Sequence, residues 1–417
     1  MVSKYNIMLA HDNSYYVYNL LSRKLNVISS ELYEQLCDNN KLIETDEEQL
    51  ELYKNGMYYN EDVNETNIFL NKYYKAIYEP KLHITIITTT SCNFSCKYCY
   101  EEYRGSCIDE DFINVMSKFI AKHIKDYSGV YIEWFGGEPL LAIEQIISLS
   151  TKIKDICRKQ RKSYIGSMTT NGYLLDTNTF HRLLQSNIIF YQITVDGLEK
   201  EHDYLRPLKN GGGSYNTILN NLCAIKRDTP SSKIFSIVIR NNICDINMNS
   251  SKNFIKVFES FFSDDLRFKI YQHPIMDWGG NRIDEINSEL SNKNYITVNG
   301  KKRMYSNLFE SINSAMCSSN RESSFVLDPE YNIYKCTHDV QNEEKCIGKM
   351  SINGDIKLQD NKINYYRLSF SESCKECSYL PFCAIERCPK LRLEYKDCKK
   401  SVRKEILEIL YNYISCL

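Results

Sequence analysis

The fold is indicated most directly by Thr88-Thr89-Thr90-Ser91-Cys92-Asn93-Phe94-Ser95-Cys96-Lys97-Tyr98-Cys99-Tyr100, a stretch that directly follows an apolar strand candidate. Its cysteines have the spacing C-x3-C-x2-C. Three thiolates on one tight loop, with no fourth ligand nearby, suit a cube of iron and sulfide, whereas structural zinc sites usually take four ligands. The alternatives are a zinc loop and chance spacing. The loop therefore predicts an iron–sulfur centre at the end of a strand.

Alternating apolar strands and amphipathic helices extend from this loop toward the C-terminus. The strand candidates are 83–89, 131–134, 163–169, 188–195, 234–240 and 267–271, and the helical patterns between them are 112–127, 141–158, 179–185, 215–225 and 250–261. Strands separated by helices predict a parallel sheet with right-handed crossovers. Six units are fewer than the eight of a closed barrel, so we expect an α/β fold, an open partial (β/α)6 TIM-like barrel. Its chemistry is expected beyond the C-terminal ends of the strands.

Two further segments flank the predicted barrel. Residues 1–80 contain short strand candidates at 5–10, 15–19 and 24–27, a helix at 31–37, and a capping box at 45–48, which together predict a small α+β module. Residues 301–417 show little regular pattern between Cys317 and Cys398 and close with an amphipathic helix at 402–414. We therefore predict three domains, 1–80, 81–300 and 301–417.

The composition excludes several classes of protein. The chain has 417 residues, with 52 basic and 53 acidic side chains, so it lacks the basic excess of a general nucleic-acid or anionic-membrane binder. It shows no apolar signal core at its start and no apolar run of membrane-spanning length. Its 17 cysteines are clustered rather than spread, which favours thiolate–metal ligation in a reducing cytoplasm over a secreted disulfide scaffold.

The cysteine triad, with Tyr98 before its last cysteine, resembles the signature of the radical S-adenosylmethionine (SAM) enzymes. A second matching segment directly follows the second strand, Trp134-Phe135-Gly136-Gly137-Glu138-Pro139. It resembles the family segment that contacts the methionine amino group of SAM, and Glu138 would accept a hydrogen bond from that group. The resemblance implies that Cys92, Cys96 and Cys99 hold a SAM-binding [4Fe-4S] cluster.

Short polar residues at the later strand ends are weaker signals. Taken singly, each is as well explained as a turn residue. Because family counterparts occur in the same order, the resemblance implies that SAM is contacted by Tyr98, Gly136, Gly137, Glu138, Pro139, Thr170, Asn171, Asp196, Arg206 and Asn242. His273 and Asp277, at the end of the sixth strand, are candidates to face the substrate, although a lone histidine is more often structural.

The second cysteine cluster resembles the SPASM extension of radical SAM enzymes. By that resemblance Cys374, Cys377, Cys383 and Cys398 hold one auxiliary [4Fe-4S] cluster, and Cys317, Cys336 and Cys388 hold another. The fourth ligand of the latter is open between Cys346 and a substrate thiolate. Two departures loosen the assignment, four residues instead of three between Cys383 and Cys388, and Tyr331 where a glycine is usual. A pair of zinc sites is the alternative.

The resemblance implies a reaction class. One electron from the SAM-binding cluster cleaves SAM to methionine and a 5′-deoxyadenosyl radical, which abstracts hydrogen from an unactivated C–H bond, and the auxiliary clusters offer a route for a second electron. SPASM-type enzymes are oxidoreductases that modify peptides and proteins. The expected partners are therefore a precursor peptide with a leader and a reductant protein of the flavodoxin or ferredoxin type.

Two activities compete within this class. One is maturation of a ribosomally made peptide (a RiPP), for instance by forming a thioether; the other is formylglycine formation in a sulfatase. Residues 1–80 resemble leader-binding modules, and Thr337 stands where sulfatase maturases place an aspartate after the second SPASM cysteine. Both features favour peptide maturation, with His338 and Asp339 as weak catalytic candidates. A non-catalytic metal-binding scaffold is the alternative of another class.

Overall fold

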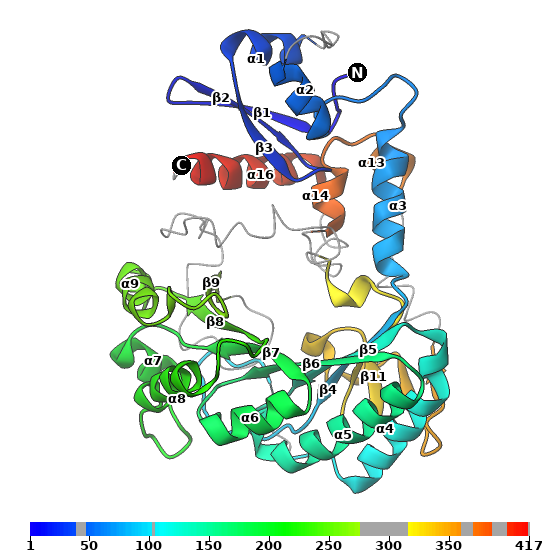
Figure 1. Ribbon diagram of the computed structural model, residues 1–417, viewed down its shortest axis with the longest axis vertical. Coiled ribbons are helices and arrows are strands. Elements are labelled where there is room, and N and C mark those ends of the chain that lie inside the picture. The colour runs from blue at the N-terminus through cyan, green and yellow to red at the C-terminus, as the bar shows by residue number, and fades with distance from the viewer. Residues whose placement is uncertain (39–46, 102–104, 276–315, 360–369, 386–397, 416–417) are drawn as a thin grey trace. The chain divides into compact units, whose positions relative to one another are not determined.

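The computed structural model describes residues 1–38, 47–101, 105–275, 316–359, 370–385 and 398–415 (Figure 1). These residues fall into two compact units. One unit is drawn from Pro80–Asn299 and Ser323–Tyr365, and the other from Met1–Glu79, Gly300–Glu322 and Tyr366–Leu417. No helix in the described ranges is both long and apolar enough to cross a bilayer.

The first unit is built on six parallel strands that pair in chain order. They are β4 (Lys81–Ile87), β5 (Gly129–Phe135), β6 (Ser163–Thr170), β7 (Ile188–Thr194), β8 (Ser236–Ile243) and β9 (Phe268–Pro274). The connecting helices are α4 (Glu110–His123), α5 (Ile143–Lys159), α6 (Thr177–Gln185), α7 (Glu199–Leu205), α8 (Tyr215–Asp228) and α9 (Ser251–Phe262). Helices α4, α5 and α6 lie along one face of the sheet (Figure 1). The predicted open partial barrel is confirmed.

Helix α4 illustrates why the covering helices form where they do. Its N-cap Asp109 accepts a hydrogen bond from the Phe112 amide at 2.8 Å, which satisfies one of the free N–H groups of the first turn. Phe112, Met116 and Phe119 recur every three or four residues and are buried against the sheet. The basic Lys122 in the last turn suits the negative end of the helix dipole.

Strand alternation separates the core of this unit from its open face. On β5, the side chains of one parity are buried beneath the helices: Val130, Ile132 and Trp134. Those of the other parity are partly exposed and line a cavity on the opposite face: Tyr131, Glu133 and Phe135. Because successive strand residues point to opposite faces, each strand serves the core and the cavity at once.

Four short strands extend the sheet beyond β4, where the sequence showed no regular pattern. Strand β10 (Ser324–Leu327) pairs parallel with β4, and the antiparallel strands β11 (Asn332–Tyr334), β12 (Gly348–Met350) and β13 (Ile356–Leu358) follow it outward. The expectation of an irregular segment between Cys317 and Cys398 was therefore wrong in this part. Strands of three or four residues are too short to show a period.

The second unit joins the start of the described chain to its end. It contains a three-stranded antiparallel sheet of β1 (Asn6–His11), β2 (Ser14–Asn19) and β3 (Lys24–Ile28), with helices α1 (Ser30–Cys37), α2 (Glu47–Lys54) and α3 (Glu65–Ile77). It also contains α13 (Glu372–Lys375), α14 (Leu380–Ile385) and α16 (Cys398–Ile414). The predicted strands, first helix and C-terminal helix of these segments are confirmed, whereas α3, α13 and α14 were not predicted. In the barrel unit, α7 was not predicted. Part of the predicted capping box, Thr45 and Asp46, lies outside the described residues.

Packing divides the chain differently from the three predicted domains. Residues of the predicted C-terminal domain occur in both units, since β10 to β13 extend the barrel sheet and the later helices join the N-terminal module. The functional assignment of the three segments stays a prediction.

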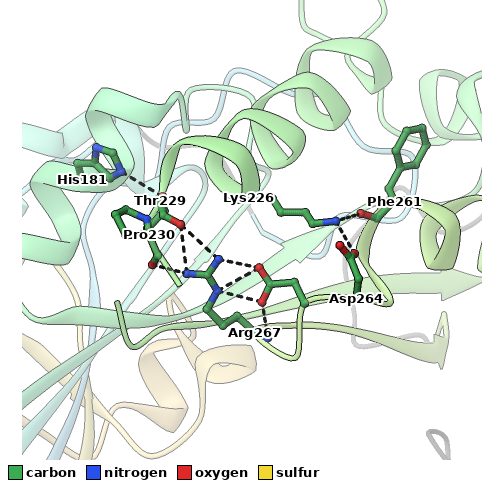
Figure 2. Close-up of polar contacts among 8 residues, drawn as sticks. His181, Lys226, Thr229, Pro230, Phe261, Asp264 and Arg267 are labelled. Carbon is green, nitrogen blue, oxygen red and sulfur yellow. Dashed lines mark hydrogen bonds and ion pairs between the residues drawn. The ribbon is translucent and has the colours of Figure 1, made fainter. Parts of the chain in front are cut away.

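Arg267 fixes the amino end of β9, the end opposite the cavity. Its guanidinium donates to the carbonyl oxygen of Pro230 at 2.8 Å and that of Thr229 at 3.4 Å, and to the Asp265 carboxylate at 2.7 Å (Figure 2). The hydrogen bond from the Arg267 guanidinium to the Asp265 carboxylate holds the pKa of Asp265 below its usual range. Arg267 and Asp265 are both largely buried, so solvent screens the pair little.

Lys226 on α8 makes a comparable but more exposed link. Its ammonium donates to the Phe261 carbonyl oxygen at 2.6 Å and pairs with Asp264, whose side chain is 72% exposed (Figure 2). The two cations thus join the α8–β8 and α9–β9 connections at one end of the sheet.

We expect Arg267→Ala to lower the free energy of unfolding by about 1–3 kcal/mol, because it removes the guanidinium that donates to two carbonyl groups and a largely buried carboxylate. Lys226→Ala is the matched control, with an expected cost below about 1 kcal/mol because its partner is solvated. Urea denaturation followed by circular dichroism measures both. Equal costs would contradict this account of the amino end.

Candidate active site

A cavity of about 620 Å³ lies at the carboxyl ends of the parallel strands. Its walls come from the loop after β4, the segment after β5, and the inward side chains of β5 to β9. Loops at this end of a parallel sheet are the usual place for binding and catalysis. The position agrees with the expectation from the sequence.

The cysteine loop forms one wall of this cavity, and Cys92, Cys96 and Cys99 all line it. The loop is fixed against the chain that follows α7, because the Ser95 amide donates to the Pro207 carbonyl oxygen at 2.8 Å and the Lys97 amide to that of Leu205 at 3.0 Å. All three cysteines are free thiols.

Burial raises the pKa of Cys92 to about 11 and that of Cys96 to about 12, so both thiols are neutral near pH 7 without a metal. Binding a metal centre would release their protons. Among the described residues, no three His, Cys, Asp or Glu side chains are grouped to hold a single metal ion. Three free thiols on one cavity wall form a donor set that fits a [4Fe-4S] cluster, whose ligands bind different irons.

Gly136 and Gly137 pack directly on the cysteine loop. The Gly137 amide donates to the Thr89 carbonyl oxygen at 2.9 Å, and the Glu138 amide donates to that of Ser91 at 2.9 Å. A Cβ atom on Gly137 would lie 2.3 Å from the Ser91 oxygen, and Gly136 has φ +128° with the Thr89 oxygen 2.4 Å from its Cβ position. The two glycines are therefore required by the loop beside them, in addition to lining the cavity.

Glu138 is a buried connection between the strand ends. Its carboxylate accepts hydrogen bonds from the Leu140 amide at 3.0 Å, the Thr170 hydroxyl at 2.6 Å and the Asn171 amide at 2.8 Å. Asn171 in turn donates to the Asn93 side chain at 2.7 Å, inside the cysteine loop. Burial raises the pKa of Glu138 despite these donors. The carboxylate thus positions Thr170 and Asn171, which line the cavity, while Glu138 lies behind them.

A second buried network joins four of the predicted cofactor-binding residues. The Tyr98 hydroxyl donates to Asp196 and accepts from Arg206 Nη1 at 2.6 Å and Asn242 Nδ2 at 3.0 Å. The Asn242 amide donates to Asp196 at 2.8 Å, and Arg206 lies 3.7 Å from the same carboxylate. Burial raises the pKa of Tyr98 well above its usual value, so the phenol keeps its proton as the donor to Asp196.

Arg206 carries a feature that fits a bound ligand. Its side chain is only 10% exposed and lies on the cavity wall, yet its Nε has no hydrogen-bond partner among the described residues. A buried donor without a partner costs about 1–3 kcal/mol. A polar ligand in the cavity would supply the missing acceptor.

His202 supports this network from behind. Its Nδ1 accepts from the Asp196 amide at 3.0 Å, and its Nε2 lies 3.0 Å from the Ser214 hydroxyl, which donates to the Arg206 carbonyl oxygen at 3.2 Å. Burial lowers the pKa of His202 well below its usual value, so the ring is neutral. One histidine therefore positions both ends of the Asp196–Arg206 pair.

The structure brings most of the predicted site residues together. Those that line the cavity are Tyr98, Gly136, Gly137, Thr170, Asn171, Arg206 and Asn242, together with the catalytic candidates His273 and His338. Glu138 and Asp196 are fully buried behind the wall, and Pro139, which begins a short 3-10 helix, is also buried. Asp339 is buried and is absent from the described lining, and Asp277 lies outside the described residues.

Several residues of the cavity were not predicted. They include Tyr100, Glu101, Glu133 and Gln192, of which the last two point inward from β5 and β7. Thr85 donates to Glu133 at 3.0 Å, and burial raises the pKa of this carboxyl. A polar side chain at every second position of a strand was the available signal.

The cysteines of the second cluster lie in both units. Cys336 and Cys346 belong to the barrel unit, where Cys336 Sγ lies 3.5 Å from His338 Nδ1 and the His338 ring lies 4.5 Å from that of Tyr100. Cys317, Cys374, Cys377 and Cys383 belong to the other unit. Cys388 lies outside the described residues, and Cys398 begins α16. The ligand sets of the auxiliary clusters stay predictions.

We expect Gly137→Ala to destabilise the protein by about 1–3 kcal/mol and to reduce iron bound by the triad, because its Cβ would overlap a backbone oxygen that cannot rotate away. Gly212→Ala is the control, since its nearest neighbours are side-chain atoms at 3.2 and 3.4 Å. Thermal denaturation and iron quantitation test both. Normal stability and iron content in Gly137→Ala would contradict the packing role of this glycine.

Residues 86–248 match the family model described as the radical SAM superfamily, a range that begins in β4 and ends beyond β8. The chain is 22% identical over 329 residues to a cysteine-type anaerobic sulfatase-maturating enzyme of Clostridium novyi (strain NT), covering 71% of this chain and 84% of that protein. It is 21% identical over 327 residues to a serine-type anaerobic sulfatase-maturating enzyme of Klebsiella aerogenes, covering 70% and 76%.

Among solved structures, native anSMEcpe with bound AdoMet and Cp18Cys peptide is similar in fold. The TM-score is 0.53 at 18% identity, covering 81% of this chain and 98% of that one. The family model spans the cysteine loop, Gly136-Gly137 and the Tyr98 network. The chain therefore carries a radical SAM domain, and the radical SAM superfamily is the family to which that domain belongs.

Proposed function

We propose that the protein is a radical SAM maturase that oxidatively modifies a ribosomally made peptide, forming a thioether or a related side-chain cross-link. The observation that carries the proposal is a folded N-terminal module with a core of its own, in a chain that also carries a radical SAM domain. A reducing, cytoplasmic location belongs to the same proposal, because thiolate-bound clusters need reduced cysteines.

Within the cavity, Cys92, Cys96 and Cys99 would hold the [4Fe-4S] cluster. SAM would lie against Gly136, Gly137, Thr170, Asn171, Arg206 and Asn242, all of which line the same space. Together, a bound cluster and SAM would supply a carbon-centred radical able to abstract a hydrogen atom. Arg206 Nε, a buried donor, supports a polar ligand group on this wall. Asp196, His202 and Glu138 would act by holding these residues in place.

The N-terminal module supports a peptide as the substrate. It has its own core, which includes Val17, Leu32 and Leu52. In the described part of the module, β3 is an edge strand with β2 on one side, and its Val27 is 66% exposed. Such an edge accepts an extended peptide as an added strand, with backbone hydrogen bonds that do not depend on sequence. A leader peptide would bind at this edge of the module.

Formylglycine formation in a sulfatase is the second candidate, because the curated relatives described above are sulfatase-maturating enzymes. The residue after Cys336 distinguishes the two. Here it is Thr337, with His338 on the cavity wall and Asp339 buried to 2% exposure. A threonine cannot serve as a base in the manner of an aspartate, which favours peptide maturation. Two auxiliary clusters and a flavodoxin- or ferredoxin-type reductant complete the proposal.

We expect Glu138→Gln to weaken SAM binding by about tenfold or more. The amide NH₂ would face the backbone N–H of either Asn171 or Leu140, neither of which can accept a hydrogen bond, leaving a buried donor unpaired and moving the wall residues. Equilibrium dialysis with labelled SAM measures the change on reconstituted protein. Glu144→Gln is the control, because Glu144 on α5 makes an exposed ion pair with Arg182 on α6. Unchanged SAM affinity with intact iron content would show that Glu138 does not position the site.

Co-expression with a short cysteine-containing peptide encoded beside the gene tests the activity. We expect a peptide lighter by two hydrogen atoms, resistant to thiol alkylation and unreactive toward a hydrazine. A hydrazine-reactive carbonyl would instead identify formylglycine and contradict cross-linking. Full-length protein with Cys92→Ala is the control and should leave the peptide unmodified. Iron-free protein that makes no 5′-deoxyadenosine would favour the non-catalytic scaffold.

A further inference from the structure

The turn between Cys374 and Cys377 is held by the N-terminal module of the same compact unit. The carbonyl oxygen of Lys375, inside this C-x2-C turn, accepts hydrogen bonds from Lys4 Nζ at 2.9 Å and from the Thr66 hydroxyl at 3.1 Å. Lys4 lies two residues before β1, and Thr66 lies in the first turn of α3. Two elements more than 300 residues away along the chain therefore meet on one peptide group of the turn.

The donors themselves are fixed before they reach the turn. Lys4 Nζ also donates to Thr66 Oγ1 at 2.6 Å, and the Lys4 amide donates to Glu65 at 2.9 Å. The Tyr5 ring is fully buried beneath them, with its hydroxyl 3.5 Å from Thr66 Oγ1. Lys4 thus loses little further freedom in binding the turn.

Apolar packing fixes the same segment on its N-terminal side. The ring of Phe370 lies 6.2 Å from that of Phe69 and 5.1 Å from that of Tyr73, both edge-to-face, and both partners are fully buried on α3. The Cys377 amide donates to the Cys374 carbonyl oxygen at 3.0 Å, which keeps the turn tight. The separation of the two thiols is therefore set partly by the N-terminal module.

The ammonium of Lys4 also places a positive charge on the turn that joins the two cysteines, 2.9 Å from the Lys375 carbonyl oxygen. Cys374, Cys377 and Cys383 are partly buried and form no disulfide with a described residue, so their thiols are donors of the kind that an iron–sulfur cluster takes. A nearby positive charge stabilises the more negative, reduced form of an iron–sulfur cluster, and a partly buried position weakens solvent screening.

We propose that Lys4 and Thr66 are positioning residues for an iron–sulfur cluster at Cys374, Cys377 and Cys383, and that Lys4 raises its reduction potential. The inference rests on the auxiliary cluster of the proposed function. It gives the N-terminal module a role beyond leader binding, because the module supports and tunes the redox centre of its own unit.

The test uses the full chain with Cys92, Cys96, Cys99, Cys317 and Cys336 replaced by alanine, so that after anaerobic reconstitution the remaining iron is that of the cluster at Cys374, Cys377 and Cys383. EPR-monitored redox titration gives the midpoint potential, and transfer of iron to a chelator gives the rate of cluster loss. We expect Lys4→Met to make the potential more negative and iron loss about tenfold faster. Thr66→Val should speed iron loss with little change in potential, because it removes a donor and no charge.

Three controls separate the possible outcomes. Lys4→Arg should restore the potential, since it keeps the charge, and Thr66→Ser should restore iron retention. Lys72→Met removes an exposed lysine from α3, the helix that carries Thr66, and should change neither the midpoint potential nor the rate of iron loss. If Lys4→Met behaves like Lys72→Met while iron is retained, the inference is overturned and the auxiliary cluster stands. If the parent protein, which carries only the cysteine-to-alanine replacements, retains no iron, the auxiliary cluster itself is refuted and the inference with it.

Discussion

Backbone pairing between the cysteine loop and Gly136-Gly137 is the constraint on which the candidate site depends. The parallel register of β4 and β5 continues past the last strand residues, so that the amides of Gly137 and Glu138 donate to carbonyl groups of the loop. This contact fixes the positions of the three thiols and of Glu138, whose side chain is buried. From Glu138, hydrogen bonds reach Thr170 and Asn171, and Asn171 returns to the loop. Hydrogen bonds along the cavity wall thus connect the Gly137–Glu138 backbone to the cysteine loop, Glu138 to Asn171, and Asn171 back to the loop.

The buried charges behind the wall are organised so that each acid has several donors. Asp196 receives hydrogen bonds from Tyr98 and the Asn242 amide, with Arg206 nearby, and Glu138 receives three hydrogen bonds. Burial raises the pKa of both acids, and the donors oppose that shift. A partly satisfied buried acid is costly, so removal of any one donor would disturb the others. Rigidity of this kind suits a site that must protect a reactive radical from water and from its own side chains.

Much of the fold and of the candidate site could be predicted because its signals are local. The β/α alternation located the six parallel strands, and the cysteine spacing located the loop, since both depend on neighbours in sequence. The positions of Glu138 and Asp196 were harder to predict. Nothing in the sequence distinguishes a carboxylate that lines the cavity from one that is buried behind the wall. Strands β10 to β13 were missed because three or four residues show no period. The bond from Lys4 to Lys375 joins opposite ends of the chain, and no local pattern encodes it.

The pairing of β10 with β4 also has a consequence for biosynthesis. β4 begins the barrel, yet one of its two neighbours is a strand that emerges from the ribosome more than two hundred residues later. Until then its outer edge presents free amide and carbonyl groups in a nascent chain whose other barrel strands already exist. Long-range pairing of this kind slows folding and exposes a site for wrong association. A chain released before β10 is made would therefore contain the whole cysteine loop, but its β4 would keep an unpaired edge.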